Sequence, residues 1–231
     1  MMLPVEKQDP LRMREMFSTV APRYDLITRL FSYGMDRRWK RLGVDRAGLP
    51  ERPVVLDLAC GTGDFSKLAA QCRPGAFACA VDLTPRMLRL ARAGGVSDTV
   101  CADAMCLPFR DASFDCVFIG YGLRNFPRLE AALEEIHRVS RPGGRLVTLD
   151  FYLPEHALLR ALYLGCLWVQ GAFWGLVLHG RARVYTYIPD SLRGFVSIAE
   201  ISRLLRRSGY GRVDARPFVC GGIGLHWAAK E

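Results

Sequence analysis

The chain has 231 residues, of which 50% are hydrophobic and 24% charged, which excludes a disordered chain and allows a sizeable buried core. Its formal net charge of +9 favours an acidic partner without choosing among nucleic acid, anionic lipid and acidic ligand. The eight cysteines form no CxxC pair and the four histidines lie far apart, so we expect reduced thiols in the cytoplasm and no metal site.

Strands and helices alternate through the first two thirds of the chain. No apolar run precedes Pro10, so we expect no signal peptide. Short apolar runs followed by turns predict strands at 54–58, 77–81, 98–102, 114–120 and 145–151. Helices are expected over 64–71, from Thr84-Pro85 to Gly94-Gly95, and over 127–141, where Pro142-Gly143-Gly144 ends the last one. This alternation predicts a parallel sheet with right-handed crossovers.

The carboxyl-terminal part has a different pattern. A helix over 197–208 leads into strands at 212–218 and 223–229, joined by a Cys220-Gly221-Gly222 turn, which is typical of an antiparallel hairpin. We therefore predict a Rossmann-like α/β fold with a doubly wound, mostly parallel sheet of seven strands that ends in this hairpin.

An apolar segment over 157–178 separates the two parts and contains only two strongly polar residues, Arg160 and Gln170. It is nearly long enough to span a bilayer, but both flanks must return to one sheet and three glycines interrupt it. We expect a helical cap, inserted over 157–190, that touches a membrane; a buried cap helix and a dimer interface are the alternatives. Eight arginines against three acids over 181–216 favour an anionic membrane, or form a solvated face.

A cofactor site is predicted where the first strand ends. Gly61 and Gly63 would let the backbone approach a ligand, and Asp82 follows Gly63 by nineteen residues, where it could accept hydrogen bonds from a ribose. Dinucleotides and S-adenosylmethionine (SAM) share this geometry. Ser66 stands where a dinucleotide motif requires a smaller residue, and the acids Asp64 and Asp103 suit a cofactor without phosphate. These residues favour SAM; a plain tight turn is the alternative.

Several motifs resemble known methyltransferases. The segments 54–64, 80–84, 103–104 and 138–151 resemble class I SAM-dependent methyltransferases in general. The segments 17–25, 119–126, 187–195 and 221–223, with His226, resemble the ubiquinone/menaquinone C-methyltransferases more closely. The chain departs from that family at Thr28, Asp36 and Val196, and the stretch 152–180 matches it poorly.

The resemblance implies a single domain over 1–231, with a helical entry segment over 1–53, that C-methylates a polyprenylated hydroquinone with SAM. The residues implied to bind SAM are Asp57, Gly61, Thr62, Gly63, Asp82, Leu83, Asp103, Ala104 and Gly120. The residues implied to face the quinol are Tyr24, Tyr121, Arg124, Asn125 and Tyr187, although Tyr24 and Tyr187 could simply pack. The apolar segment would then line the site of the prenyl tail. We expect a cytoplasmic protein, peripheral on the inner face of the membrane.

The chemistry of that reaction suggests roles for two residues. A ring carbon becomes nucleophilic when the adjacent hydroxyl ionises, and a phenol has a pKa of about 10, so the site must stabilise a phenolate. Arg124 would stabilise this oxyanion because a guanidinium is a poor base. Water or His226 would take the proton. The alternatives are a surface ion pair for Arg124 and a hydrogen-bonded core histidine for His226.

Four other functions remain open from the sequence. They are methylation of another small molecule (a natural-product phenol, a sterol or a phospholipid), methylation of nucleic acid, nicotinamide-dependent reduction, and a non-catalytic SAM-binding or membrane scaffold. The chain shows no aromatic-proline tetrad of the Asn-Pro-Pro-Tyr kind and no basic stripe interleaved with aromatic residues, so we expect no nucleic-acid partner.

Overall fold

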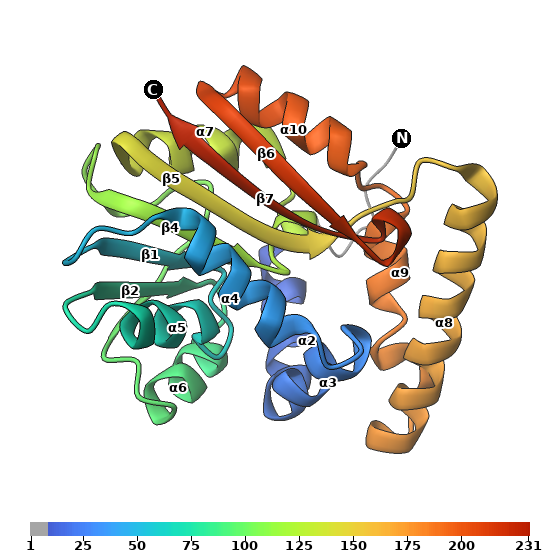
Figure 1. The fold of residues 1–231 in the computed structure, drawn as a ribbon. Helices are drawn as coiled ribbons and strands as arrows, with labels where there is room; N and C mark the ends of the chain where they lie inside the picture. Colours follow the sequence, from blue (N-terminus) through green and yellow to red (C-terminus); the bar gives the residue numbers. More distant parts are fainter. Residues whose placement is uncertain (1–8) are drawn as a thin grey trace.

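The computed structural model describes residues 9–231 as a twisted sheet with helices on both faces and one long helix, α8, standing at its side (Figure 1). The expectation about a signal peptide falls mostly on residues 1–8, outside the described part. The strands are Val54–Leu58 (β1), Phe77–Asp82 (β2), Asp98–Cys101 (β3), Phe114–Gly120 (β4), Ser140–Phe151 (β5), Tyr210–Phe218 (β6) and Ile223–Lys230 (β7).

The strand order is β3-β2-β1-β4-β5-β7-β6. Strands β1 to β5 pair in parallel, β7 runs antiparallel to β5, and β6 pairs antiparallel with β7. The predicted doubly wound sheet with a C-terminal hairpin is confirmed. Its order reverses between β1 and β4, so the carboxyl ends of these two strands flank the crevice in which ligands of open α/β sheets bind.

Helices cover the sheet and build a separate layer beside it. The α-helices are Pro10–Val20 (α2), Tyr24–Phe31 (α3), Asp36–Ala47 (α4), Asp64–Cys72 (α5), Pro85–Ala93 (α6), Leu129–Val139 (α7), Ala157–His179 (α8), Tyr187–Leu192 (α9) and Ile198–Arg207 (α10). Short 3-10 turns occupy Ala21–Arg23 (η1), Leu123–Asn125 (η2), Ala182–Val184 (η3) and Val219–Gly221 (η4). Helix α2 begins where Asp9 caps it and Pro10 takes its first position.

Two apolar clusters hold the layers together. Helices α4 and α5 pack on one face, where Phe65 of α5 stacks on Phe118 of β4 with ring centroids 4.9 Å apart. Helices α7 and α10 pack on the other face, where Ile136 and Ile201 meet residues of β1, β4 and β5. Because the parallel strands are covered on both faces, they consist of nearly continuous apolar runs.

The predicted helix over 127–141 was too long at its carboxyl end. Helix α7 ends at Val139, and β5 begins at Ser140, so Pro142-Gly143-Gly144 lies inside a strand. The register of β4 and β5 shifts between Phe114 and Cys116, and Gly143 has a φ of 73°. This irregularity accommodates a proline and a left-handed glycine that a regular strand would exclude.

The glycines of the apolar segment do not interrupt its helix. Helix α8 runs unbroken through Gly165, Gly171 and Gly175. A Cβ atom at Gly171 would lie 2.9 Å from the carbonyl oxygen of Tyr185, and one at Gly175 would lie 2.6 Å from that of Arg181. Two of the three glycines are therefore packing positions, where the helix touches the backbone that follows it.

The stacked rings of Phe65 and Phe118 give a test of the packing between α5 and the sheet. We expect Phe65→Ala to lower the free energy of unfolding by about 3–5 kcal/mol, because it opens a cavity at a side chain that is 2% exposed. The matched control is Phe77→Ala, at a phenylalanine that is 50% exposed, where about 0.5 kcal/mol or less should be lost. Denaturant unfolding measures both, and equal losses would contradict this packing.

Candidate active site

The turn after β1 lies at the switch point and depends on two glycines. Gly61 and Gly63 have φ values of 55° and 81°, in the left-handed region that side chains disfavour. A Cβ atom at Gly63 would lie 2.7 Å from a methyl group of Val96, so the turn has no room for one. The Tyr24 ring lies 3.1 Å from the corresponding point on Gly61. The turn therefore places backbone atoms without side chains at the crevice, and the Tyr24 ring packs against Gly61.

Asp82 ends β2 beside this turn. Its Oδ2 accepts a hydrogen bond of 2.9 Å from the amide of Gly61, and its Oδ1 accepts one of 2.8 Å from the amide of Thr84. Burial raises the pKa of the Asp82 carboxyl above its ordinary value, and these hydrogen bonds oppose the shift. Each oxygen retains a second lone pair, so the carboxylate can accept hydrogen bonds from two vicinal hydroxyls.

Asp103 follows β3 along the same edge of the sheet. Its Oδ1 accepts a hydrogen bond of 2.9 Å from the amide of Met105, which fixes the carboxylate at the mouth of the crevice. Leu83 and Ala104, the neighbours of the two acids, line the same space. This arrangement suits an adenosine whose ribose lies at Asp82 and whose amino group reaches Asp103.

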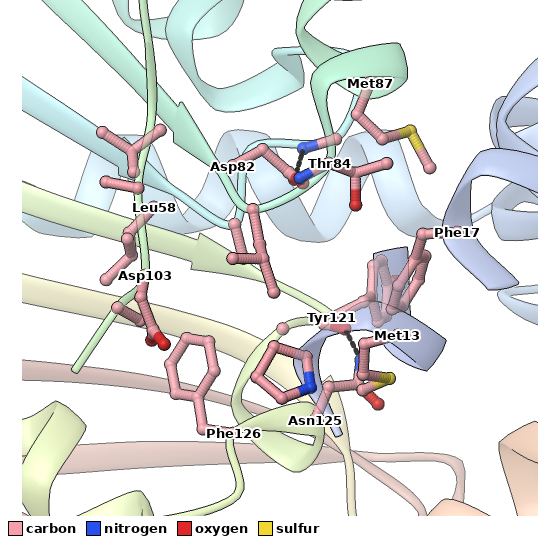
Figure 2. A pocket seen from close by; sticks show the side chains of 18 of the residues that line it. Met13, Phe17, Leu58, Asp82, Thr84, Met87, Asp103, Tyr121, Asn125 and Phe126 are labelled. Carbon is pink, nitrogen blue, oxygen red and sulfur yellow. Dashed lines mark hydrogen bonds between the residues drawn. The ribbon is translucent and has the colours of Figure 1, made fainter. Parts of the chain in front are cut away.

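These residues enclose a pocket of about 790 Å³, part of which is open to solvent. Figure 2 shows Asp82 and Met87 on one side, Tyr121, Asn125 and Phe126 on the other, and Asp103 at one end. The lining is mostly apolar with a few convergent polar groups, as small-molecule sites usually are. Its apolar lining and its two carboxylates fit SAM, a cofactor with a ribose, an adenine and no phosphate.

Sequence reasoning missed part of the lining. Pro10, Met13 and Phe17 of α2 form one wall, and Thr84, Met87, Met105 and Phe126 complete it. The capped start of α2 at Asp9-Pro10 is a readable helix signal. Nothing in that signal shows that the helix folds back over the switch point, because this depends on tertiary packing.

Four residues predicted to bind the cofactor lie behind the pocket lining. Asp57 is buried and accepts hydrogen bonds from the Ser66 amide and hydroxyl, and burial raises the pKa of Asp57 to about 7. The Thr62 hydroxyl donates to Asp25 at 2.6 Å. A Cβ atom at Gly120 would meet the ring of Phe65 at 3.1 Å, and Gly63 packs on Val96. In this structure the four residues shape the turn.

Lys40 is a further buried residue of this region, and the sequence did not single out its role. Its Nζ lies 2.6 Å from Asp64 Oδ2 and 3.5 Å from Asp36 Oδ2. Burial acts to raise the pKa of Asp64, but the charge and hydrogen bond of Lys40, together with the charges of Lys67 and Arg37, outweigh it and lower the value. The lysine thereby ties α4 to the start of α5.

Arg124 is buried directly behind the pocket. Its side chain is 3% exposed, and its Nη1 donates to Asp150 Oδ1 at 2.6 Å and to the Tyr121 carbonyl at 2.7 Å. Burial acts to lower the pKa of Arg124, but the charge and hydrogen bond of Asp150, together with the charges of Tyr187 and Tyr24, outweigh it and hold the value above the ordinary one. The guanidinium stays charged. The surface ion pair considered from the sequence is wrong, because both partners are buried.

Two tyrosines lie around this guanidinium. Burial and then the charge of Tyr187 raise the pKa of Tyr24, while Arg124 opposes the shift. Burial raises the pKa of Tyr187, and a hydrogen bond with Arg124 opposes that shift. Both hydroxyls therefore remain protonated donors within the electrostatic reach of Arg124. Tyr24 lines the pocket together with Tyr121 and Asn125, whereas Tyr187 reaches Arg124 from α9.

His226 lies elsewhere, on β7 in the core. It is 0% exposed, its Nε2 lies 3.1 Å from the carbonyl oxygen of Ile198, and its Nδ1 lies 3.3 Å from the Tyr152 hydroxyl. Because the carbonyl can only accept, Nε2 carries the proton and Nδ1 accepts from Tyr152. Burial lowers the pKa of His226 to about 4. These are the contacts of a neutral core histidine outside the pocket lining.

Known proteins with this sequence pattern are methyltransferases. The model of the ubiE/COQ5 methyltransferase family matches residues 5–230. A demethylmenaquinone methyltransferase of Thermus thermophilus is 40% identical over 84% of this chain and 91% of its own length. That of Deinococcus radiodurans is 38% identical over 98% and 95%. A ubiquinone/menaquinone biosynthesis C-methyltransferase of Desulfotalea psychrophila is 37% identical over 94% and 89%.

Solved structures support the fold. A SAM-dependent methyltransferase of Thermotoga maritima superposes with a TM-score of 0.66 at 20% identity, covering 94% of this chain and 99% of that one. A phosphoethanolamine N-methyltransferase of Haemonchus contortus, bound to S-adenosylhomocysteine, has a TM-score of 0.64 at 14% identity over 82% and 52%. With the full-length family match, they identify this chain as a SAM-dependent methyltransferase that belongs to the ubiE/COQ5 methyltransferase family.

Proposed function

We propose that this enzyme methylates a ring carbon of a polyprenylated hydroquinone in quinone biosynthesis. The relatives named for demethylmenaquinone or ubiquinone/menaquinone biosynthesis support this substrate. The observation that carries the proposal is a group of buried polar atoms on the segment 121–125. Tyr121 Oη, Arg124 Nε and Asn125 Oδ1 have no hydrogen-bond partner among the described residues. Buried polar atoms are rarely left unpaired, so this grouping points to a polar ligand beside the cofactor pocket.

SAM supplies an electrophilic methyl group on its sulfonium when it is bound. Asp82 and Asp103 would hold its adenosine, and the backbone around Gly61 would lie along the rest of the cofactor. The apolar walls of the pocket exclude water from the reacting atoms, which strengthens the electrostatic interactions there.

The contribution of Asp82 to the affinity for the cofactor can be measured directly. We expect Asp82→Asn to weaken S-adenosylhomocysteine binding by about tenfold or more, because the amide offers one acceptor in place of two and loses the charge. The control is Asp98→Asn, at an exposed aspartate that starts β3, which should leave the affinity unchanged. Isothermal titration calorimetry gives both values, and equal affinities would remove Asp82 from the site.

The acceptor ring would lie with one hydroxyl near Arg124. Loss of its proton gives a phenolate, whose charge moves onto the adjacent ring carbon. That carbon would accept the methyl group that SAM supplies, with S-adenosylhomocysteine as the leaving group, and the ring would then lose the hydrogen of the methylated carbon. Arg124 Nε and the Tyr121 hydroxyl would donate hydrogen bonds to the phenolate oxygen, which stabilises the charge that develops before transfer.

Arg124 does not itself take the phenol proton, because the Asp150 carboxylate keeps the guanidinium charged. His226 is the other group that the sequence suggested. Since both of its ring nitrogens are engaged in the core, we propose that water takes the proton. Arg124 then acts by stabilising the anion.

Arg124 also provides the test of the proposed reaction. With labelled SAM and short-chain demethylated naphthoquinol and benzoquinol, we expect a C-methylated product from the wild-type enzyme. Arg124→Met should lower kcat by about 10²–10³, the usual loss for one oxyanion donor. Transfer to a phenol oxygen, or to neither quinol, would contradict the proposal.

The matched variant is Arg124→Met combined with Asp150→Asn. The single variant leaves the buried Asp150 carboxylate without its partner, which costs about 3–5 kcal/mol of stability, whereas the double variant leaves a neutral amide. Both should bind S-adenosylhomocysteine and both should lose turnover. If the double variant recovered the wild-type kcat, Arg124 would serve the fold and not the reaction.

His226→Gln separates a core role from a catalytic one. Burial lowers the folded-state pKa of His226 from 6.5 to about 4, so its contribution to stability is present above pH 6.5 and is lost as the pH falls through about 4. We expect His226→Gln to remove this part of the pH dependence of unfolding while leaving the pH profile of kcat unchanged. Denaturant unfolding across that pH range, with kcat, tests both. A lost acidic limb in the kcat profile would make His226 the base.

A further inference from the structure

The outer face of α8 carries a stripe of exposed apolar side chains. Leu158, Leu162, Val169, Phe173 and Leu176 follow one another at helical spacing and are between 54% and 63% exposed. Trp168, which is 51% exposed, lies next to the stripe. Isolated exposed leucines are ordinary, but a continuous stripe along a 23-residue helix marks an interaction surface.

By length and composition alone, α8 could cross a membrane. Its packing shows a different arrangement, because the inner face is held against the fold through Leu167, Gly171 and Gly175. The chain enters α8 from β5 and leaves it through η3 to α9, which carries Tyr187 beside Arg124. Figure 1 shows α8 upright at the edge of the molecule with α9 on its inner side. Only its outer face is therefore available to a partner.

The charges on α8 and on the turn after it have one sign, and the exposed Glu155 lies just before the helix. No aspartate or glutamate occurs from His156 to Pro189, while Arg160, Arg181 and Arg183 lie on or just after the helix. Arg23 is close to the carboxyl-terminal end, since burial and then its charge lower the pKa of His179. An apolar stripe with an aromatic residue and arginines at its ends matches the acyl boundary and anionic headgroups of a bilayer.

We propose that the outer face of α8 docks in the plane of an anionic lipid bilayer, with Trp168 and Phe173 inserted at the headgroup boundary and the arginines on the phosphates. A second copy of the chain fits this face less well. A two-fold pairing of α8 with itself would bring Arg160, Arg181 and Arg183 of both copies together against a single acid from each copy, Glu155.

The test uses the full chain and sedimentation with vesicles of phosphatidylcholine, alone or mixed with phosphatidylglycerol. We expect the wild-type chain to bind the mixed vesicles more tightly. Phe173→Gln should weaken binding about tenfold, because one buried aromatic side chain is lost. The matched control is Phe77→Gln, which removes an equally exposed phenylalanine from β2, away from α8 (Figure 1).

A charge variant tests whether the arginines bind the lipid phosphates. Arg181→Gln with Arg183→Gln should weaken binding to the mixed vesicles only, about tenfold or more. Arg86→Gln with Arg89→Gln, on exposed positions of α6, removes the same charge from another face and should change nothing. S-adenosylhomocysteine affinity and thermal unfolding confirm that each variant is folded.

Three outcomes would overturn the proposal. They are no sedimentation of the wild-type chain with either vesicle, equal binding by Phe173→Gln and Phe77→Gln, and a lipid-free dimer that Phe173→Gln converts to a monomer. Because vesicle binding is read without quinol or turnover, its failure is distinguishable from failure of the proposed reaction.

Discussion

The buried carboxylate of Asp150 fixes Arg124 beside the cofactor pocket. Its Oδ1 accepts hydrogen bonds from Arg124 Nη1 at 2.6 Å and from the Phe151 amide at 2.7 Å, and its Oδ2 accepts one from the Arg124 amide at 3.2 Å. The carboxylate is 0% exposed, so these contacts must offset the cost of removing two charges from water. A buried ion pair is weak evidence for stability, since an apolar pair of similar volume often serves as well. What this pair provides is a fixed position for a charge beside the pocket.

The segment 121–125 depends on that anchor. Tyr121 has a φ of 60°, a conformation that costs a tyrosine about 1–2 kcal/mol. Its carbonyl accepts hydrogen bonds from Arg124 Nη1 and Asn125 Nδ2, and its amide donates to Leu149 of β5 at 2.7 Å. The strained residue is thus held from both sides, and strain at a ligand site is commonly maintained in this way. As a result, Tyr121 and Asn125 line the pocket while Arg124 lies behind them.

The sequence predicted the features that short stretches of residues determine by themselves. Apolar runs ended by turns located each parallel strand, and the spacing of Gly63 and Asp82 brought them to one edge of the sheet. It did not predict that Asp150 pairs with Arg124, because Asp150 lies on β5 and Arg124 lies in the η2 turn after β4, and the two meet only through the pairing of β4 with β5. The sequence also did not predict that α2 lines the pocket, because the position of this helix depends on tertiary packing. The three glycines of the apolar segment were expected to interrupt it, and the packing role of Gly171 becomes visible only from its contact with Tyr185.

The strand order explains why one edge of the sheet can bind two different molecules. Strand β1 is followed by the glycine turn, β2 ends at Asp82, and Asp103 follows β3. On the other side, β4 leads into Tyr121 and Arg124, and β5 carries Asp150 near its end. The switch between β1 and β4 separates these groups, so acids that suit a cationic cofactor lie on one side and the buried arginine on the other. In the proposed reaction, a sulfonium bound on one side and an anionic ring bound on the other would meet at this boundary, where their opposite charges would cancel as the methyl group is transferred.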